Sequence, residues 1–372
     1  MRAPIRPFLG LAGIALLAGC SAPVADTTAT PPAAGSHEVT AAPVARIGEA
    51  FLTPMTPADN IDSPASWQAP DGSVWLIATA KASDKLVVYD GQSGVHLRDV
   101  GSAGTGAGQF DRPNGIAVVD DLLLVVERDN RRVQVLTLPD FTPVGHFGQQ
   151  ELRKPYGLWV NKTGQGTYDL YVTDSWDNGE DAQGNDILPP LAELDRRVRR
   201  YALSIIDGKA RAQLAANIGD TSERGALRVV ESLWGDPAND RLLIAEEDET
   251  WANEFKVYNL DGKFTGQVFG GEKLTAQAEG IMLRTCGEAG WWITTEQGKA
   301  RSTFHLFDRH TLAHVGAFEG KVVANTDGIW NSQQASARFP NGALYAVHDD
   351  QGVVAFDWND IARALSLPEC GL

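Results

Sequence analysis

Short apolar segments recur along this chain, and each is followed by a polar turn and a second apolar segment. The first segments read SPASW, NGIAV, YGLWV, ESLWG, EGIML and DGIWN. The second segments include SVWLIATAK, DLLLVVERD, RLLIAEEDE and GWWITTEQG, and a third strand-like segment follows in most repeats. Such runs are typical of β-strands. Six copies in register predict an all-β fold, a six-bladed β-propeller, and argue against the alternative of a β-sandwich.

The spacing of the repeats is regular except at one place. The small residues of five first segments stand at positions 115, 157, 232, 280 and 328, which gives spacings of 42, 75, 48 and 48. We interpret polar residues 175–195 as an insertion that explains the long interval. A segment near residues 43–53 is expected to supply a closing strand, and DWNDIARAL a short terminal helix.

The N-terminal residues predict export and lipidation. Arg2 and Arg6 precede the apolar run Phe8–Leu17, which is too short to span a bilayer. The sequence LAGC then predicts a lipoprotein signal at residues 1–19, with Cys20 as the lipidated residue; an ordinary signal peptide is the alternative. Ser21 in place of Asp favours the outer membrane over inner-membrane retention. Residues 20–45 read as a disordered linker and residues 46–372 as the propeller.

Charge and cysteine content narrow the choice of partner. The net charge is −16, and loss of the two arginines in residues 1–19 makes it −18, which argues against a nucleic-acid partner. A polyanion would bind only if cations mediate the contact. Cys286 and Cys370 remain after lipidation, and the sequence leaves open whether they form a disulfide or two separate thiols. Oligomerisation is not indicated, so a monomer is expected.

Acidic residues gather where loops of a propeller converge at one end of its axis. The run Ala245–Glu249 contains four consecutive carboxylates after an apolar strand. Such a run suits a hard divalent cation, since calcium takes six to eight oxygen ligands, although a solvated acidic turn is the other reading. Further candidates are Asp62, Glu231, Glu279, Glu296, Asp327, Asp349 and Asp350.

At these residues the chain resembles the calcium-dependent β-propeller phytases. The family's acidic strand end appears as AEEDE at 245–249, and its later motifs as AEG ending at Gly280, EQG with Gln297 and TDG with Asp327. The N-terminal motif appears as Asp62 to Trp67, and the family's basic and aromatic residues match Lys81, Arg128 and Tyr156. The resemblance covers most of residues 60–364.

The resemblance implies phosphomonoesterase activity on inositol hexakisphosphate, with Ca²⁺ bridging acidic side chains and phosphates. It implies that Lys81 and Arg128 neutralise phosphate oxygens, that Tyr156 lies beside them, and that Glu231 and Glu247 belong to the catalytic set. The implied metal ligands are Asp62, Glu231, Glu246, Glu247, Asp248, Glu279, Gln297, Asp327 and Asp349.

Several positions depart from the family pattern. Ser63 and Gln277 replace acids, Ala82 replaces a second lysine, and Asp174-Ser175 stands where a further lysine is expected, which Arg197 or Arg199 would have to replace. The second repeat, GTGAGQFDRPNGIAVV onward, also resembles an NHL repeat, a family that mostly binds ligands. The competing hypotheses are therefore a non-catalytic, ligand-binding propeller of the bacterial surface and a lactonase-type propeller that binds a single calcium ion.

Overall fold

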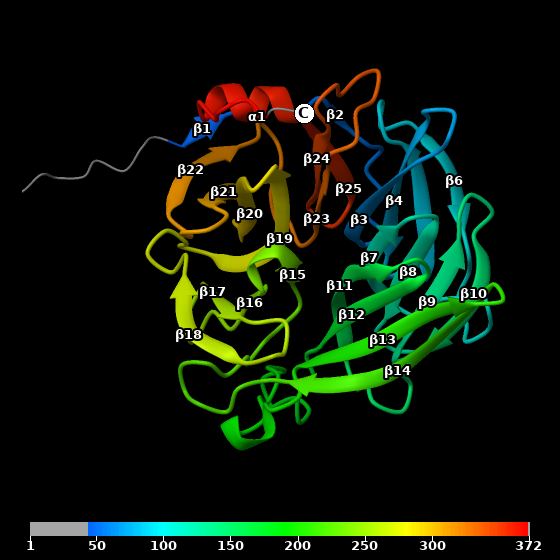
Figure 1. Ribbon diagram of the computed structural model, residues 1–372, viewed down its shortest axis with the longest axis vertical. Helices are drawn as coiled ribbons and strands as arrows, with labels where there is room; N and C mark the ends of the chain where they lie inside the picture. The colour runs from blue at the N-terminus through cyan, green and yellow to red at the C-terminus, as the bar shows by residue number, and fades with distance from the viewer. Residues whose placement is uncertain (1–43, 371–372) are drawn as a thin grey trace, which may run out of the picture. The chain divides into compact units, whose positions relative to one another are not determined.

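The computed structural model describes residues 44–370. The expected signal peptide and Cys20 lie outside the described residues, as does most of the expected linker. Within residues 44–370 the strands form six sheets, one after another around a common axis, which confirms the six-bladed β-propeller (Figure 1). No helix in this range is long and apolar enough to cross a membrane.

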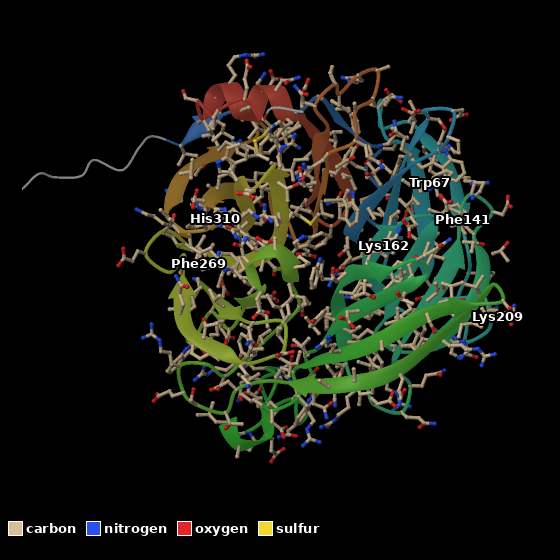
Figure 2. The ribbon with its side chains drawn as sticks, in the orientation of Figure 1. Trp67, Phe141, Lys162, Lys209, Phe269 and His310 are labelled. Atoms are coloured by element: carbon tan, nitrogen blue, oxygen red, sulfur yellow. A yellow bond between two sulfur atoms is a disulfide. The ribbon has the colours of Figure 1, made fainter. Side chains whose placement is uncertain are left out.

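Each blade is an antiparallel sheet in which chain order runs from the axis outward. Blade 1 contains β3 (Ile61–Gln68), β4 (Val74–Ala80), β5 (Lys85–Asp90) and β6 (His96–Val100). Blade 2 contains β7 (Pro113–Val119), β8 (Leu122–Glu127), β9 (Arg132–Thr137) and β10 (Thr142–Phe147). Blade 3 contains β11 (Pro155–Gly164), β12 (Thr167–Asp174), β13 (Val198–Ile206) and β14 (Lys209–Ile218). Lys209 of β14 accordingly lies at the periphery in Figure 2.

Blades 4 to 6 repeat this arrangement, with shorter inner strands in blades 4 and 6. They contain β15 (Leu233–Asp236), β16 (Arg241–Glu246), β17 (Glu254–Tyr258), β18 (Phe264–Phe269); β19 (Gln277–Cys286), β20 (Ala289–Gln297), β21 (Thr303–Asp308), β22 (His314–Glu319); β23 (Ile329–Ser332), β24 (Ala343–His348) and β25 (Gly352–Asp357). Short 3₁₀ turns cover Leu191–Glu193 and Pro237–Asn239. Residues 175–195 connect β12 to β13, as expected of an insertion.

The N-terminal segment completes the last two blades. β2 (Phe51–Leu52) pairs antiparallel with β25 as the outermost strand of blade 6, which confirms the expected closing strand. β1 (Ala45–Arg46) pairs parallel with β22 at the edge of blade 5. The expected terminal helix is α1 (Trp358–Ala364), which begins at Asp357, whose side chain accepts from the Asn359 N–H and so caps the helix.

The apolar core is divided into the spaces between adjacent blades. Six clusters of buried side chains follow the ring, and each joins strands of two neighbouring blades. Trp234 and Trp330 pack against several clusters from the axis and meet edge to face, with ring centroids 5.9 Å apart. These two indoles therefore fill the middle of the propeller.

The inner strands of blades 3 and 4 approach each other so closely at Gly157 that a side chain would not fit there. A Cβ on Gly157 would lie 2.0 Å from the Glu231 carbonyl oxygen. Thr173 bridges the same two blades, because its Oγ1 accepts from Gly157 N–H at 2.8 Å and donates to Glu231 O at 3.2 Å. The backbones of consecutive blades are thus in direct contact where the inner strands begin.

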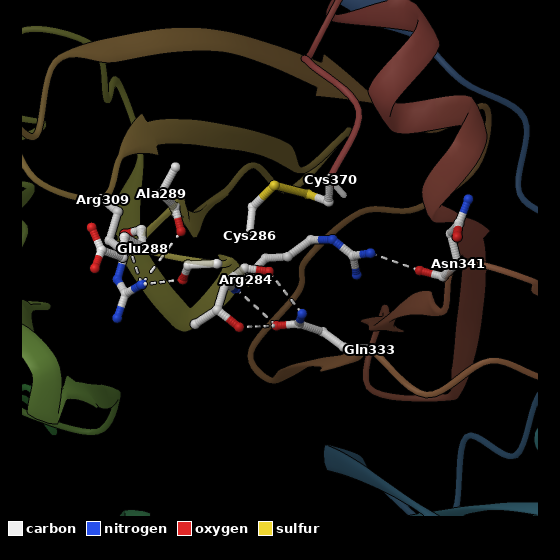
Figure 3. Close-up of a disulfide and its surroundings, with 10 residues drawn as sticks. Arg284, Cys286, Glu288, Ala289, Arg309, Gln333, Asn341 and Cys370 are labelled. Carbon is white, nitrogen blue, oxygen red and sulfur yellow. Dashed lines mark hydrogen bonds between the residues drawn. A yellow bond between two sulfur atoms is a disulfide. The ribbon is translucent and has the colours of Figure 1, made fainter. Parts of the chain in front are cut away.

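A disulfide ties the C-terminal tail to blade 5. Cys286 at the end of β19 is bonded to Cys370, which settles the question that the sequence leaves open. Figure 3 shows Arg284 beside this bridge, where it donates to the Asn341 carbonyl oxygen at 2.7 Å. The disulfide therefore links the segment after α1 to blade 5, and the Arg284–Asn341 hydrogen bond links blade 5 to blade 6.

We expect Gly157→Ala to lower the free energy of unfolding by about 2 kcal/mol or more, because the added methyl group meets backbone that cannot move aside. Gly271→Ala is the matched control, since its Cβ would have neighbours only at 3.7 Å and beyond. Urea unfolding of both variants checks this. Equal effects of the two substitutions would contradict the close approach of blades 3 and 4.

Removal of the disulfide by Cys286→Ser with Cys370→Ser should cost about 2–4 kcal/mol, because the bridge closes a long loop in the unfolded chain. The measurement is unfolding of wild type and double variant in urea. Reducing agent should lower the stability of the wild type and leave the double variant unchanged; a reductant effect of equal size on both would argue against the bridge.

Candidate acidic site at the mouth of the axis

Six equivalent positions surround one end of the axis. Each blade contributes the residue directly before the small residue of its inner strand, and these residues are Asp62, Asn114, Tyr156, Glu231, Glu279 and Asp327. Five of them line a cavity of about 70 Å³, and Trp234 and Trp330 also line it. We call these six residues the axial ring. Because four of the six are carboxylic acids, the mouth of the axis is strongly acidic.

Buried acids on the second strands hold the loops that carry the axial ring. Glu246 at the end of β16 accepts from the backbone N–H groups of Arg228 and Val229, each at 3.1 Å. Its second partner is Lys256 on β17, at 2.8 Å, and both side chains are fully buried. Glu246 therefore anchors the loop that leads to Glu231, and its oxygens are already occupied.

The same arrangement occurs in three other blades. An acid near the end of the second strand accepts backbone N–H groups of the preceding loop and pairs with a base on the third strand. The pairs are Glu127–Arg132, Asp174–Arg199 and Glu296–His305. We call these three pairs, together with Glu246–Lys256, the loop anchors.

Three glutamates form one side of the acidic mouth, which we call the glutamate half: Glu231, Glu247 and Glu279. Glu247 accepts from the N–H groups of Glu231 and Ser232 at 3.2 and 2.9 Å, which holds it behind the axial ring. Its other oxygen, Oε2, is buried and has no hydrogen-bond partner among residues 44–370. The hydroxyl of Ser232 reaches Glu279 at 3.5 Å.

Burial and mutual repulsion disturb the ionisation of these glutamates. Burial first, and then the charge of Asp62, raises the pKa of Glu231 to about 7. Burial raises the pKa of Glu247 well above its usual range, with a further contribution from Glu231, and Glu279 behaves likewise because Glu247 and Asp327 are near it. When ionised, the three carboxyl groups therefore repel one another, because the buried site screens their charges poorly.

The other side of the mouth, the aspartate half, contains Asp62 and Asp327 with a cation between them. Lys81 Nζ lies 2.9 Å from Asp62 Oδ1 and 3.3 Å from Asp327 Oδ2. Gln297 donates its amide N–H to the other oxygen of Asp327. Burial raises the pKa of Asp327 most, the charge of Asp62 raises it next, and the nearby Asp350 raises it further. Lys81 thus bridges two neighbouring members of the axial ring.

Basic groups also lie beside Tyr156. Arg128 Nη1 donates to the Tyr156 hydroxyl at 3.4 Å, and its Nε bonds to the exposed Asp129. Lys154 is close enough to favour ionisation of Glu231, and its ammonium group pairs with Asp177 and Asp186 of the insertion. The insertion therefore reaches the rim of the site through Lys154.

Some of the residues selected from the sequence are placed outside this arrangement. Asp248 caps its own turn through Thr250, and Asp349 is exposed and accepts from Gln351. Asp350, rather than Asp349, faces Asp327. Arg197 bonds to backbone carbonyls and Ser175, and Arg199 to Asp174 and Asn217, so neither reaches the mouth in place of a lysine.

Sequence reasoning missed Lys154 as a site residue. The family pattern drew attention to Asp174-Ser175, at the end of the second strand of blade 3. The cation instead comes from the preceding loop, and the Asp174 side chain holds the Lys154 backbone N–H at 2.8 Å. The available signal was its position two residues before Tyr156.

The mouth fits a hard divalent cation in its donor chemistry. All candidate donors are oxygens, and one buried carboxylate oxygen of Glu247 has no partner among the described residues. Fully buried Asn114 likewise has no partner in residues 44–370 for either polar atom of its amide. In the same range no three His, Cys, Asp or Glu side chains are already grouped to hold one ion, so binding would include their rearrangement.

Comparison with known proteins assigns no family to this chain. No protein-family model and no curated protein matches the sequence. The chain is similar to a chain of the nidogen/laminin complex, with 13% identity over 74% of this chain and 86% of that chain and a TM-score of 0.46. It is also similar to Kuenenia stuttgartiensis hydrazine synthase, with 12% identity, 85% and 81% coverage and a TM-score of 0.47.

Without divalent ions, stability should fall as pH rises from about 4.5 towards 8. In the folded state Glu231, Glu247 and Glu279 keep protons that the unfolded chain releases in this pH range. Each of them therefore lowers the free energy of unfolding by up to about 1.4 kcal/mol per pH unit, until the pH passes its pKa in the folded state. For Glu231 this pKa is about 7. Urea unfolding in chelator at several pH values measures this. Glu279→Gln should flatten the profile and Glu249→Gln should not; identical profiles would contradict the assigned ionisation.

Proposed function

We propose that this protein is a divalent-cation-dependent phosphomonoester hydrolase of the β-propeller phytase type, acting on inositol phosphates. The observation that carries the proposal is the ring of buried carboxyl groups at the axis mouth, with raised pKa values and basic side chains beside them. Such a site has a demand for positive charge that the protein satisfies only in part. A cation shared with an anionic substrate would satisfy the rest.

Bound calcium would supply Lewis-acid polarisation of the phosphoryl oxygens and would offset the repulsion between substrate and protein. The chain's own residues have distinct tasks. Glu231, Glu247 and Glu279 provide oxygen ligands from loops fixed by the loop anchors. Arg128 presents a guanidinium whose contacts are with exposed Asp129 and the Tyr156 hydroxyl, so it is available to a phosphate without loss of a buried ion pair.

The substrate class follows from size and charge. The cavity of about 70 Å³ holds ions and water but no sugar ring, so a larger ligand must rest on the mouth. A ligand with several phosphates can contact the acidic centre through cations and the rim through Arg128 at the same time. An inositol polyphosphate meets these requirements, whereas a neutral lactone gains nothing from the basic rim.

The competing hypothesis is a propeller that binds ligands without catalysis. The NHL-like second repeat suggested it, but there the structure explains the motif by packing. Arg132 donates to the backbone oxygens of Thr105, Gly106 and Gln109, and pairs with buried Glu127. What still favours the binding hypothesis is Ser63, whose hydroxyl donates to Asp62 at 3.0 Å where the family has a second acid.

Phosphate release from phytate with calcium tests the proposal. Glu247→Gln should reduce release about 100-fold or more, because it removes charge from a buried carboxylate whose Oε2 has no partner in residues 44–370. Glu249→Gln is the control, since Glu249 is exposed two residues further on. Chelator should abolish release by the wild type. Chelator-resistant release, or none under any condition, would refute the proposed reaction.

A further inference from the structure

The two halves of the acidic mouth differ in how their charge is balanced. In the aspartate half, Lys81 contacts both Asp62 and Asp327, and its side chain is only 15% exposed. An ammonium group is therefore held between these two aspartates.

In the glutamate half, the charges of Lys81 and Lys154 act on Glu231 only from beyond ion-pair distance. Among the described residues, none of Glu231, Glu247 and Glu279 forms an ion pair with a lysine, arginine or histidine. Glu247 is 3% exposed, and its buried Oε2 has no hydrogen-bond partner in the described part of the chain. Burial of carboxylates without a countercharge is costly, so this half has the unmet demand for a cation.

We propose that Lys81 is a built-in counter-ion for the aspartate half, and that the mouth takes one divalent cation, held by Glu231, Glu247 and Glu279. This inference rests on the cation requirement of the proposed function and narrows it. It also changes the task expected of Lys81, because an ammonium held by two aspartates is not free to bind a phosphate. Lys154 is likewise held by Asp177 and Asp186, so Arg128 is left as the basic group for the substrate.

The departures from the phytase pattern agree with this partition. Ser63 stands where a second acid would follow Asp62, so the aspartate half has fewer negative charges for Lys81 to balance. Gln277 replaces an acid two residues before Glu279 and lies opposite Gln297 in the sheet, so that neighbourhood carries two amides. Ser63 thus leaves Asp62 without a second acid of that motif beside Lys81, whereas the three glutamates are all retained.

Calorimetric titration of Ca²⁺ into the full chain tests the proposal, with the number of bound ions as the readout. The wild type should bind one ion at the mouth. Glu279→Gln should weaken binding at least about 10-fold, whereas Asp62→Asn should leave both the number and the affinity within about 2-fold, because Asp62 belongs to the half that Lys81 neutralises.

Lys81→Met should raise the number of bound ions to two, since it leaves Asp62 and Asp327 without their countercharge. Lys85→Met is the matched control, because Lys85 in the same blade pairs with Asp59 and Asp99 and should leave one ion bound. If Lys81→Met does not fold, the Asp62→Asn titration still decides.

Two or more ions in the wild type, with one lost in Asp62→Asn, would overturn the proposal, as would no binding at all. One bound ion together with no phosphate release would support this inference and refute the proposed reaction. Chelator-resistant phosphate release would have the same meaning for the reaction, so the failures of the two proposals are distinguishable.

Discussion

The loop anchors are the interaction on which the site depends. In each of blades 2 to 5 a buried acid holds the backbone of one loop and the side chain of one base, and the loop then delivers its residue to the axial ring. Buried ion pairs contribute little net stability, because desolvation offsets most of the attraction. Their effect here is geometric: they fix the direction from which Tyr156, Glu231 and Glu279 reach the axis.

The two blades that lack this anchor solve the problem differently. Blade 1 ends its second strand in Ala80, and the acid sits instead on the preceding loop as Asp59, paired with Lys85. Blade 6 places His348 at the equivalent position, where its Nδ1 accepts from the Ala324 N–H at 3.2 Å. Lys81, the residue after this strand end, reaches the mouth and meets Asp62 and Asp327, just as Glu247 reaches it directly after Glu246.

The fold could be predicted from the sequence because the repeated apolar segments report directly on strands that must be buried. NGIAV, YGLWV and EGIML recur with the small residue in register, and that small residue is required by the approach of Gly157 to the Glu231 backbone. The site could be predicted only in part. Glu246 and Glu247 are alike in a sequence, but successive residues of a strand point to opposite sides, so one anchors a loop and the other faces the axis.

Turns and long-range pairing set the limits of such predictions. Asp349 and Asp350 both have positive φ, and this tight turn decides which carboxylate faces Asp327, a choice no composition rule contains. Cys286 and Cys370 are 84 residues apart, and their pairing depends on how α1 lies against blade 5. Likewise, Lys154 lies in the loop before Tyr156, and its contacts with Asp174 and with the insertion hold it there.

Closure of the propeller has a consequence for the order of folding. The outermost strand of blade 6 is β2, which lies near the start of the described chain, whereas its partner β25 lies more than 300 residues later. Blades 1 to 5 have their four successive strands close together in sequence, so each can form as its own segment becomes available, but β2 must wait without a partner until β25 exists. Long-range pairings of this kind are slow and leave an apolar edge open in the meantime. The assembling chain therefore passes through an open ring, and the acidic mouth gathers its full set of carboxylates only in the last step.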